Sequence, residues 1–262
     1  MSNYYFVKIK NDHGSTYRWT DPHLGGSCSY EDYWRLIELD KMPTCELAEA
    51  DLESDNTYIC APWNGYAAAH FNRPHKCRVI HWDIERPGLA QQPGVDEVWV
   101  SDRTQYAMHQ GFDVNYVALG GHRKLGGLPE YPKLYDFATL AYHDGRRAGM
   151  FGALASRGIL LSGNAYGPER DHILAHSHAG LMLFQDDYKI MTPLRAVLYA
   201  CWKLPIVAEH VGDTYPYRFI PFDHGLVNYN AYSSGDIQEI VDENYEMVTE
   251  TKPFWLEVEN AL

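Results

Sequence analysis

Short apolar runs alternate with amphipathic segments along most of the chain. The apolar runs predict buried strands at residues 4–9, 57–61, 77–82, 95–100, 114–119, 137–142, 159–162, 180–184, 204–208 and 218–221. Apolar positions at helical spacing, several of them preceded by capping residues, predict helices at residues 29–39, 63–71, 101–108, 146–156, 168–176, 192–201, 235–244 and 254–262. Strands that alternate with helices are typical of parallel α/β sheets.

The alternation is interrupted once, at residues 120–133, where GGHRKLGGLPEYPK is rich in glycine and proline and shows no periodicity. We therefore predict two Rossmann-like α/β domains, at residues 1–122 and 134–262, joined by a linker at residues 123–133. The last helix is expected to pack back on the body of the protein. Because open α/β sheets bind ligands at the carboxyl ends of their strands, the expected site is a cleft between the two domains.

The composition narrows the class of protein. The 262 residues carry a net charge of −13, which provides no overall basic field to attract a nucleic-acid backbone. The five cysteines form no CxxC pair and fit the reduced thiols of a cytoplasmic protein better than a disulfide framework. No segment has the apolar length of a signal peptide or a membrane span, so we expect a soluble, cytoplasmic protein.

The segment 180–212 combines a buried strand, a polar loop, a helix and a second strand. Thr192 is a preferred N-cap residue, and Pro193 is tolerated at the first helical position. Arg195, in the first turn, places a positive charge beside the unpaired N–H groups at the helix start. This combination is the chemistry of a phosphate or diphosphate site. The alternative is that Arg195 only pairs with a surface carboxylate.

A second cationic helix start follows the first strand of the second half, in the sequence YHDGRR. Gly145 allows a ligand to approach the backbone closely, and Arg146 supplies a guanidinium to an anionic diphosphate. The alternative is a solvated arginine pair on a helix surface. Tyr166, after the next strand, either stacks on a nucleobase or packs against the strand. Lys189 and Met191, in the loop before Thr192, are expected near the same ligand.

Candidate bases lie in the first half. Asp83 and Glu85 follow a strand in the sequence HWDIERP, where paired carboxylates beside a histidine supply a general base or form a salt-bridged turn. His23 lies in the long polar loop at residues 11–29, where a base would deprotonate an acceptor hydroxyl; for one of 13 histidines a structural role is the commoner alternative. Asp102 is most simply an N-cap.

Several familiar sites are missing from the sequence. There is no GxSxG elbow, no GxxxxGK[ST] loop, and no HExxH or cysteine-rich metal cluster. No GxGxxG follows the first strand, which argues against a nicotinamide enzyme. We therefore assign no metal ligands.

One combination of motifs covers about residues 135–211. It consists of GRR at a helix start, GNAYGPERDHILAHS, GLMLFQ, and a helix with Arg195 in its first turn that ends in ACWKLPIVAE. The segment WVSDRTQYAMHQGFDVNYVALGG precedes the linker. In these features the chain resembles GT-B glycosyltransferases, particularly the CgeB-like and group-1-like branch. It departs from that family near Leu198, where many members carry a glutamate for the donor ribose. Either Glu209, one strand later, substitutes for it, or the ribose is held differently, so the identity of the nucleotide stays open.

The resemblance implies a metal-independent enzyme without a cofactor, which moves a sugar from a UDP- or GDP-linked donor to an acceptor hydroxyl. It places the donor diphosphate against Arg146, Arg195 and the helix N-termini, with Lys189 assisting, so that these groups stabilise the leaving group. The acceptor, a glycan, a small molecule or modified DNA, is expected to enter from the first domain. The sequence leaves the oligomeric state open.

Two other functions stay open at this stage. The first is a phage-type enzyme that glycosylates hydroxymethylated DNA bases. It would need a basic face, for which the candidates are Arg73, His75, Lys76, Arg78, Arg123 and Lys124. The second is a non-catalytic nucleotide- or sugar-binding module that keeps the fold without the base.

Overall fold

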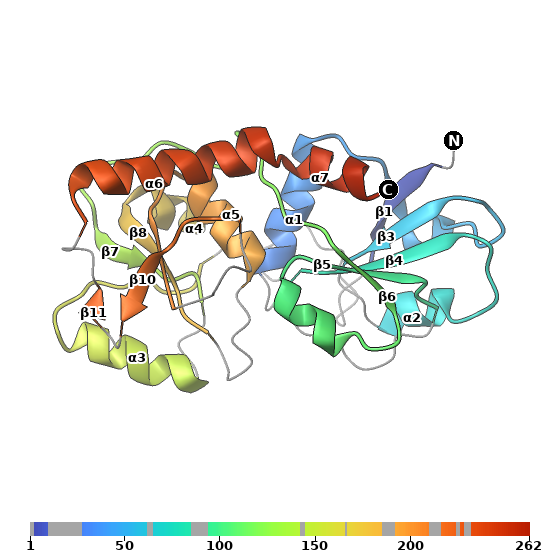
Figure 1. The fold of residues 1–262 in the computed structure, drawn as a ribbon, viewed down its shortest axis with the longest axis horizontal. Coiled ribbons are helices and arrows are strands. Elements are labelled where there is room, and N and C mark those ends of the chain that lie inside the picture. The colour runs from blue at the N-terminus through green and yellow to red at the C-terminus, as the bar shows by residue number, and fades with distance from the viewer. Residues whose placement is uncertain are drawn as a thin grey trace.

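A computed structural model describes residues 3–9, 28–61, 65–84, 94–141, 145–165, 167–184, 192–209, 216–223, 226–227 and 232–262. Two sheets, one from each half of the chain, lie side by side with helices on their faces (Figure 1). The α/β class predicted from the alternation of strands and helices is confirmed.

The N-terminal sheet has six parallel strands in the order β2-β1-β3-β4-β5-β6. Its strands are β1 (Tyr4–Lys8), β2 (Thr44–Glu46), β3 (Thr57–Cys60), β4 (Arg78–Asp83), β5 (Glu97–Val100) and β6 (Asp113–Tyr116). The central strands are almost wholly buried, as their apolar runs predict. The sequence did not predict β2, because this edge strand has three residues, none of them buried.

Helices cover both faces of the N-terminal sheet. Alternate strand residues separate the two faces: Phe6 packs in the same cluster as α1 (Cys28–Leu39), and its neighbour Val7 packs in the cluster of α2 (Gly65–Phe71). Two short 3₁₀ helices complete this half, η1 (Leu47–Glu49) and η2 (Arg103–Met108). The segment predicted as a helix at residues 101–108 is therefore a 3₁₀ helix, and Asp102 caps it by accepting the N–H of Thr104 at 2.9 Å.

The C-terminal sheet has the order β11-β10-β9-β8-β7, parallel except for the β10–β11 pair. Its strands are β7 (Tyr135–Ala138), β8 (Ser177–Met182), β9 (Ile206–Ala208), β10 (Ile220–Asp223) and β11 (Leu226–Val227). The helices of this half are α3 (Gly145–Ala155), α4 (Gly167–Ala175), α5 (Pro193–Cys201) and α6 (Ser234–Glu246), followed by the π-helical turn η5 (Met247–Thr251) and by α7 (Phe254–Ala261).

One predicted strand is wrong. Residues 159–162 form no strand of the sheet but only a single parallel bridge, between Leu161 and Phe137 of the edge strand β7. The N–H of Asp136 also donates to the carbonyl of Leu160 at 2.8 Å. Because the Leu160 side chain is 60% exposed, the apolar run does not have the burial on both faces that an inner parallel strand requires.

The chain crosses between the two halves twice, and the crossings touch. The Gly121 N–H donates to the Val248 carbonyl at 2.9 Å, and the Phe254 N–H donates to the Gly121 carbonyl at 3.1 Å. Helix α7 then lies over the N-terminal half, which brings the C-terminus close to β1 (Figure 1). The Phe254 ring stacks on Trp82 with the ring centroids 5.7 Å apart. The final helix predicted from the apolar tail is confirmed.

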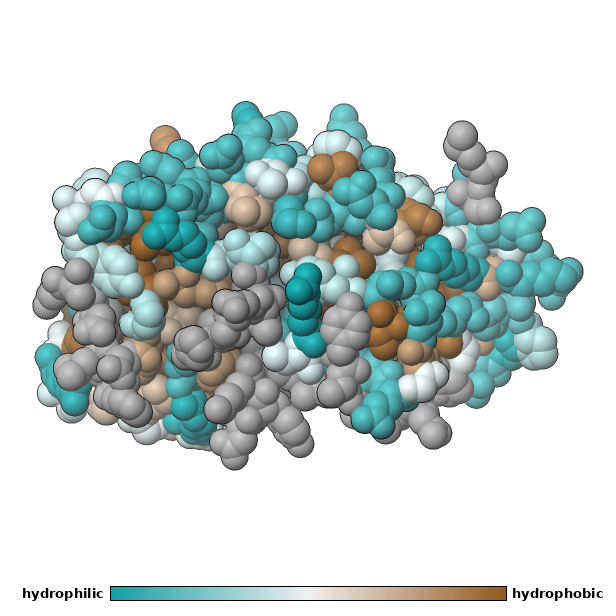
Figure 2. Space-filling model, viewed as in Figure 1, coloured by the Kyte–Doolittle hydropathy of each residue, from teal (hydrophilic) through white to brown (hydrophobic). Residues whose placement is uncertain are grey.

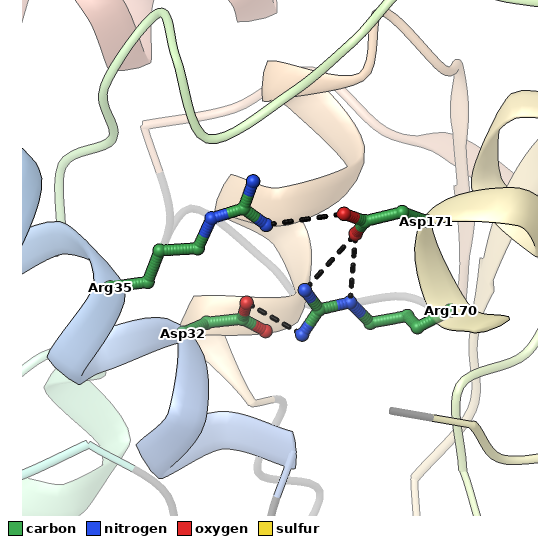
Figure 3. A network of polar contacts seen from close by, with 4 residues as sticks. All are labelled: Asp32, Arg35, Arg170 and Asp171. Carbon is green, nitrogen blue, oxygen red and sulfur yellow. Dashed lines mark hydrogen bonds and ion pairs between the residues drawn. The ribbon is translucent and has the colours of Figure 1, made fainter. Parts of the chain in front are cut away.

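A polar network, buried at Arg170 and Asp32 and partly exposed at Arg35 and Asp171, also connects the halves (Figure 3). Arg170 of α4 has no exposed surface, and its Nη1 donates to Asp32 Oδ1 of α1 at 2.7 Å. Arg170 Nη2 donates to Asp171 Oδ1 at 3.1 Å, and Asp171 accepts from Arg35 Nη1 at 3.4 Å. Burial raises the pKa of Asp32 to about 6, against the attraction of Arg170. The two charges of each sign balance, as a buried network requires.

Figure 2 shows hydrophilic side chains gathered over α6 and over the outer end of the N-terminal half. In the described part of the chain, every helix is too short or too polar to cross a lipid bilayer. Cys45, Cys60, Cys77 and Cys201 are free thiols, as the cysteine pattern predicted.

Candidate functional site

Arg146 and Glu209 form the centre of the candidate site in the C-terminal half. Gly145 begins α3 with a φ of 51°, and Arg146 follows in the first turn. Glu209 comes directly after β9. Arg146 Nη1 and Nη2 donate to the two carboxylate oxygens of Glu209 at 2.8 and 2.5 Å, and the Phe184 N–H donates to Glu209 Oε2 at 2.6 Å. The carboxylate thus holds the tips of three elements together.

This pairing fixes the Arg146 guanidinium and compensates its charge. Arg146 Nη1 also lies 3.3 Å from the Phe184 carbonyl, so the contacts of both terminal nitrogens are set by the protein. Arg147 is different: it is buried, and its Nε donates to the Leu183 carbonyl at 3.1 Å. The GRR motif is therefore not a solvated arginine pair. Its first arginine lies at the sheet edge and its second is part of the interior.

The start of α5 carries another arginine, Arg195, whose surroundings differ from those of Arg146. Thr192 occupies the N-cap position with extended backbone and Pro193 is the first helical residue, as predicted, although the Thr192 side chain makes no capping hydrogen bond. Arg195 is half-buried in the first turn. Among the residues that the structure describes, no carboxylate pairs with Arg195. The alternative of a surface ion pair therefore has no partner within the described ranges.

A close contact between strand and helix sets the position of α5. Tyr199 packs across β8 at Gly180, and a Cβ built on Gly180 would lie within 2.7 Å of three ring atoms of Tyr199. The Tyr199 hydroxyl donates to the Ala138 carbonyl of β7 at 2.9 Å. The absence of a side chain at Gly180 therefore allows α5 to lie against the sheet, and the helix start is fixed beside the strand tips.

The N-terminal half places a second polar pair at its own strand tips. Asp83 is the last residue of β4, and its Oδ2 lies 2.9 Å from Nε2 of His109. Both side chains are buried. Sequence reasoning named Asp83 but missed His109, which follows η2 without any periodic signal. The only clue was topological, because the segment after β5 returns beside the tip of its neighbour β4.

Five of the residues named from the sequence lie outside the described residues: His23, Glu85, Tyr166, Lys189 and Met191. Of the others, the structure brings Arg146 and Glu209 into contact, and it places Gly145, Thr192 and Arg195 at helix starts of the same half. Within the described ranges, no group of three or more histidine, cysteine, aspartate or glutamate side chains is arranged to hold a metal ion.

The sequence matches no protein-family model and no curated protein. Solved structures match it over nearly its whole length. The DNA-modifying enzyme beta-glucosyltransferase, solved with and without uridine diphosphoglucose, has a TM-score of 0.57 at 12% identity and covers 99% of this chain and 97% of its own. AviGT4, a glycosyltransferase of avilamycin A biosynthesis, has a TM-score of 0.56 at 12% identity, with coverages of 100% and 96%.

A sucrose-phosphate synthase from Thermosynechococcus elongatus has a TM-score of 0.50 at 9% identity, with coverages of 97% and 84%. The chain has the GT-B glycosyltransferase fold. Within this GT-B fold, each half presents one polar pair at the carboxyl ends of its parallel strands, Arg146–Glu209 in one and Asp83–His109 in the other. Parallel sheets bind ligands at this edge, so both pairs stand where a GT-B protein can use them.

Proposed function

We propose that this protein is a glycosyltransferase that moves a sugar from a nucleotide-sugar donor to an acceptor hydroxyl without a metal ion. The observation that carries the proposal is Arg195, a cation at the start of α5 with no carboxylate partner among the described residues. Its charge lies beside the unpaired N–H groups of the helix start, and the two together favour a diphosphate. The GT-B fold supports this use of the site.

In this proposal, different residues of the C-terminal half neutralise the donor diphosphate and hold the site in position. Arg195 and the helix start neutralise the charge that grows on the leaving nucleoside diphosphate as the sugar–oxygen bond breaks. Glu209, which already binds Arg146, acts by holding that guanidinium in place rather than by binding the ribose. Lys189, Met191 and Tyr166 are proposed on the donor side from their places in the chain.

The N-terminal half receives the acceptor. In this proposal Asp83, oriented by His109 at 2.9 Å, forms with it the unit that takes the proton of the acceptor hydroxyl. That oxygen forms the new bond to the anomeric carbon while the bond from this carbon to the diphosphate breaks. The negative charge therefore ends on the leaving diphosphate, beside Arg195. His23 and Glu85 are the other proposed bases.

Modified DNA is a second candidate acceptor, because the DNA-modifying beta-glucosyltransferase matches nearly the whole of both chains. The charges favour a different acceptor. Four of the six basic residues considered for a DNA-binding face lie against carboxylates: His75 with Asp96, Lys76 with Glu53, Arg78 with Glu97 and Arg123 with Glu250. These pairs leave little free positive charge for a phosphate backbone.

The test combines nucleotide binding with turnover. Thermal shift against UDP, GDP and ADP and their sugars identifies the donor, because a ligand that binds only the native state raises the melting temperature. Arg195→Ala should then abolish donor hydrolysis and transfer while the free protein melts as wild type. Arg218→Ala is the matched control, since Arg218 is exposed, pairs with Glu239 and Glu243, and precedes β10 at the opposite end of the strands.

Unchanged turnover in Arg195→Ala would refute the donor site. Nucleotide binding without turnover of any donor would favour a non-catalytic binding module. Transfer to a duplex that contains hydroxymethylated bases, but not to free glycans, would establish DNA as the acceptor.

A further inference from the structure

A pocket of about 510 Å³ lies on the N-terminal half, between α2 and η1. It is on the side of the sheet that α2 covers, away from α1 and α7. Leu47 and Ala69 supply apolar lining, and Tyr66, which is 45% exposed, presents an aromatic side chain. A volume of this size holds a small ligand or a short saccharide, and no step of the proposed transfer uses it.

Arg73 contributes a positively charged guanidinium to the lining of the pocket. Its Nε donates to the His70 carbonyl at 2.8 Å, and its Nη2 lies 3.4 Å from His70 Nδ1. His70 Nε2 lies 3.2 Å from the Ala50 carbonyl, so Nε2 carries the proton and Nδ1 accepts from Arg73. His70 thus orients the guanidinium from one side, and Nη1 makes no hydrogen bond to the residues that the structure describes.

Arg73 differs from its neighbours in having no acidic partner among the described residues. His75, Lys76 and Arg78 each lie against a carboxylate, whereas within the described ranges no aspartate or glutamate pairs with Arg73. Lys8, at the rim, forms an ion pair with Glu46 at 3.5 Å. In a protein with a net charge of −13, an oriented arginine without an acidic partner is a site for an anion.

One end of the pocket lies at the edge of the sheet that carries Asp83, because Lys8 and Glu46 are the last residues of β1 and β2. Lys8 is the last residue of β1 and Asp83 the last of β4, and β3 lies between these parallel strands. Neighbouring strands are about 4.8 Å apart, so the two tips are roughly 10 Å apart along the edge. Arg73, which follows α2, lies farther from Asp83, toward the end of the sheet where β4 and β5 begin. An acceptor that reaches both residues therefore contains several sugar units.

We propose that this pocket binds the anionic part of the acceptor, a carboxylate or phosphate carried on a sugar unit beyond the ring that is glycosylated. Arg73 pairs with the anion, and Tyr66 packs against the sugar ring. At the rim, Lys8 donates hydrogen bonds to sugar hydroxyl groups and Glu46 accepts them. This inference rests on the proposed glycosyl transfer. Without it, Arg73 serves only to bind the last carbonyls of α2.

The test is a titration of the full chain with glucuronic acid, glucose 6-phosphate and glucose, followed by calorimetry or NMR. We expect the two charged sugars to bind and glucose to bind far more weakly, and the preference between the two identifies the anion. Arg73→Gln should weaken binding of the charged sugars at least about tenfold, because an ion pair with its hydrogen bonds is lost. Lys76→Gln, outside the pocket and paired with Glu53, should bind as wild type.

Tyr66→Ala provides a second variant, since its side chain is exposed and α2 keeps its C-terminal contacts. Loss of binding there, with an unchanged melting temperature, supports the pocket even if Arg73→Gln unfolds. No binding of charged sugars by the wild type, equal loss in Lys76→Gln, or tighter binding of a DNA duplex at the same residues would overturn the proposal. UDP binding and donor hydrolysis, measured on the same samples, report the proposed function separately.

Discussion

Gly180→Ala is a sharp test of how the sheet positions α5. A Cβ at this position would lie within 2.7 Å of three ring atoms of Tyr199, whereas carbon atoms pack best at about 3.5–4.0 Å. The helix or the ring must therefore move by about 1 Å. Overpacking of this kind costs about 1–3 kcal/mol, and in a chain of this size each kcal/mol lowers the melting temperature by about 2–4 °C.

The sign of the change makes the test decisive. Without the contact, replacing glycine by alanine in a strand would stabilise the protein by about 0.5–1 kcal/mol. Urea unfolding of Gly180→Ala should instead show a loss, and nucleotide affinity should fall because Arg195 moves with α5. Gly152→Ala, in a helix where a Cβ meets nothing within 4 Å, is the matched control and should be neutral or stabilising.

The cause of the loss is isolated by a third protein. Combining Gly180→Ala with Tyr199→Leu removes the clash. The loss of unfolding free energy in the double variant should therefore be smaller than the sum of the losses in the two single variants, by about 1 kcal/mol or more. A Gly180→Ala protein as stable as wild type, or fully additive costs, would refute the packing argument.

Two further predictions concern charged side chains. Arg146→Ala and Glu209→Gln should be coupled by about 1–3 kcal/mol in a double-mutant cycle of unfolding free energies, because the bidentate pair is lost in either single variant; strict additivity would contradict the pairing. Because the folded pKa of Asp32 is about 6 and its ordinary value 3.8, the folded state keeps a proton that the unfolded chain releases. The stabilisation from this bound proton is complete below about pH 4 and is lost as pH rises through 6. The free energy of unfolding of wild type relative to Asp32→Asn, measured in urea, should therefore fall over that interval by on the order of 1–3 kcal/mol. A difference that stays constant with pH would exclude this role.

The sequence predicted the elements whose signals are local. Ser233 caps α6 through a capping box with Asp236, and Thr192 and Pro193 begin α5, because such signals depend on residues within one turn. Buried strands were found from their apolar runs. The three-residue strand β2 was missed because it has neither length nor burial.

The pairs that make the site are not local and were not predictable in this way. Arg146 and Glu209 are 63 residues apart, and Asp83 and His109 are 26 apart. Each residue was recognisable as a charged or polar side chain at the end of an element. The partner of each residue depends on the order of the strands and on the angle of each helix. The periodicity of a single segment predicts neither of these.

The two crossings between the halves determine where the chain can be divided. They are hydrogen-bonded to each other at Gly121, so the covalent connections between the lobes pass through one place. With Phe254 anchored on Trp82, removal of the last nine residues would strip cover from the interior of the opposite lobe. The N-terminal lobe is therefore not a unit that can be excised at residue 122 and still keep its core closed.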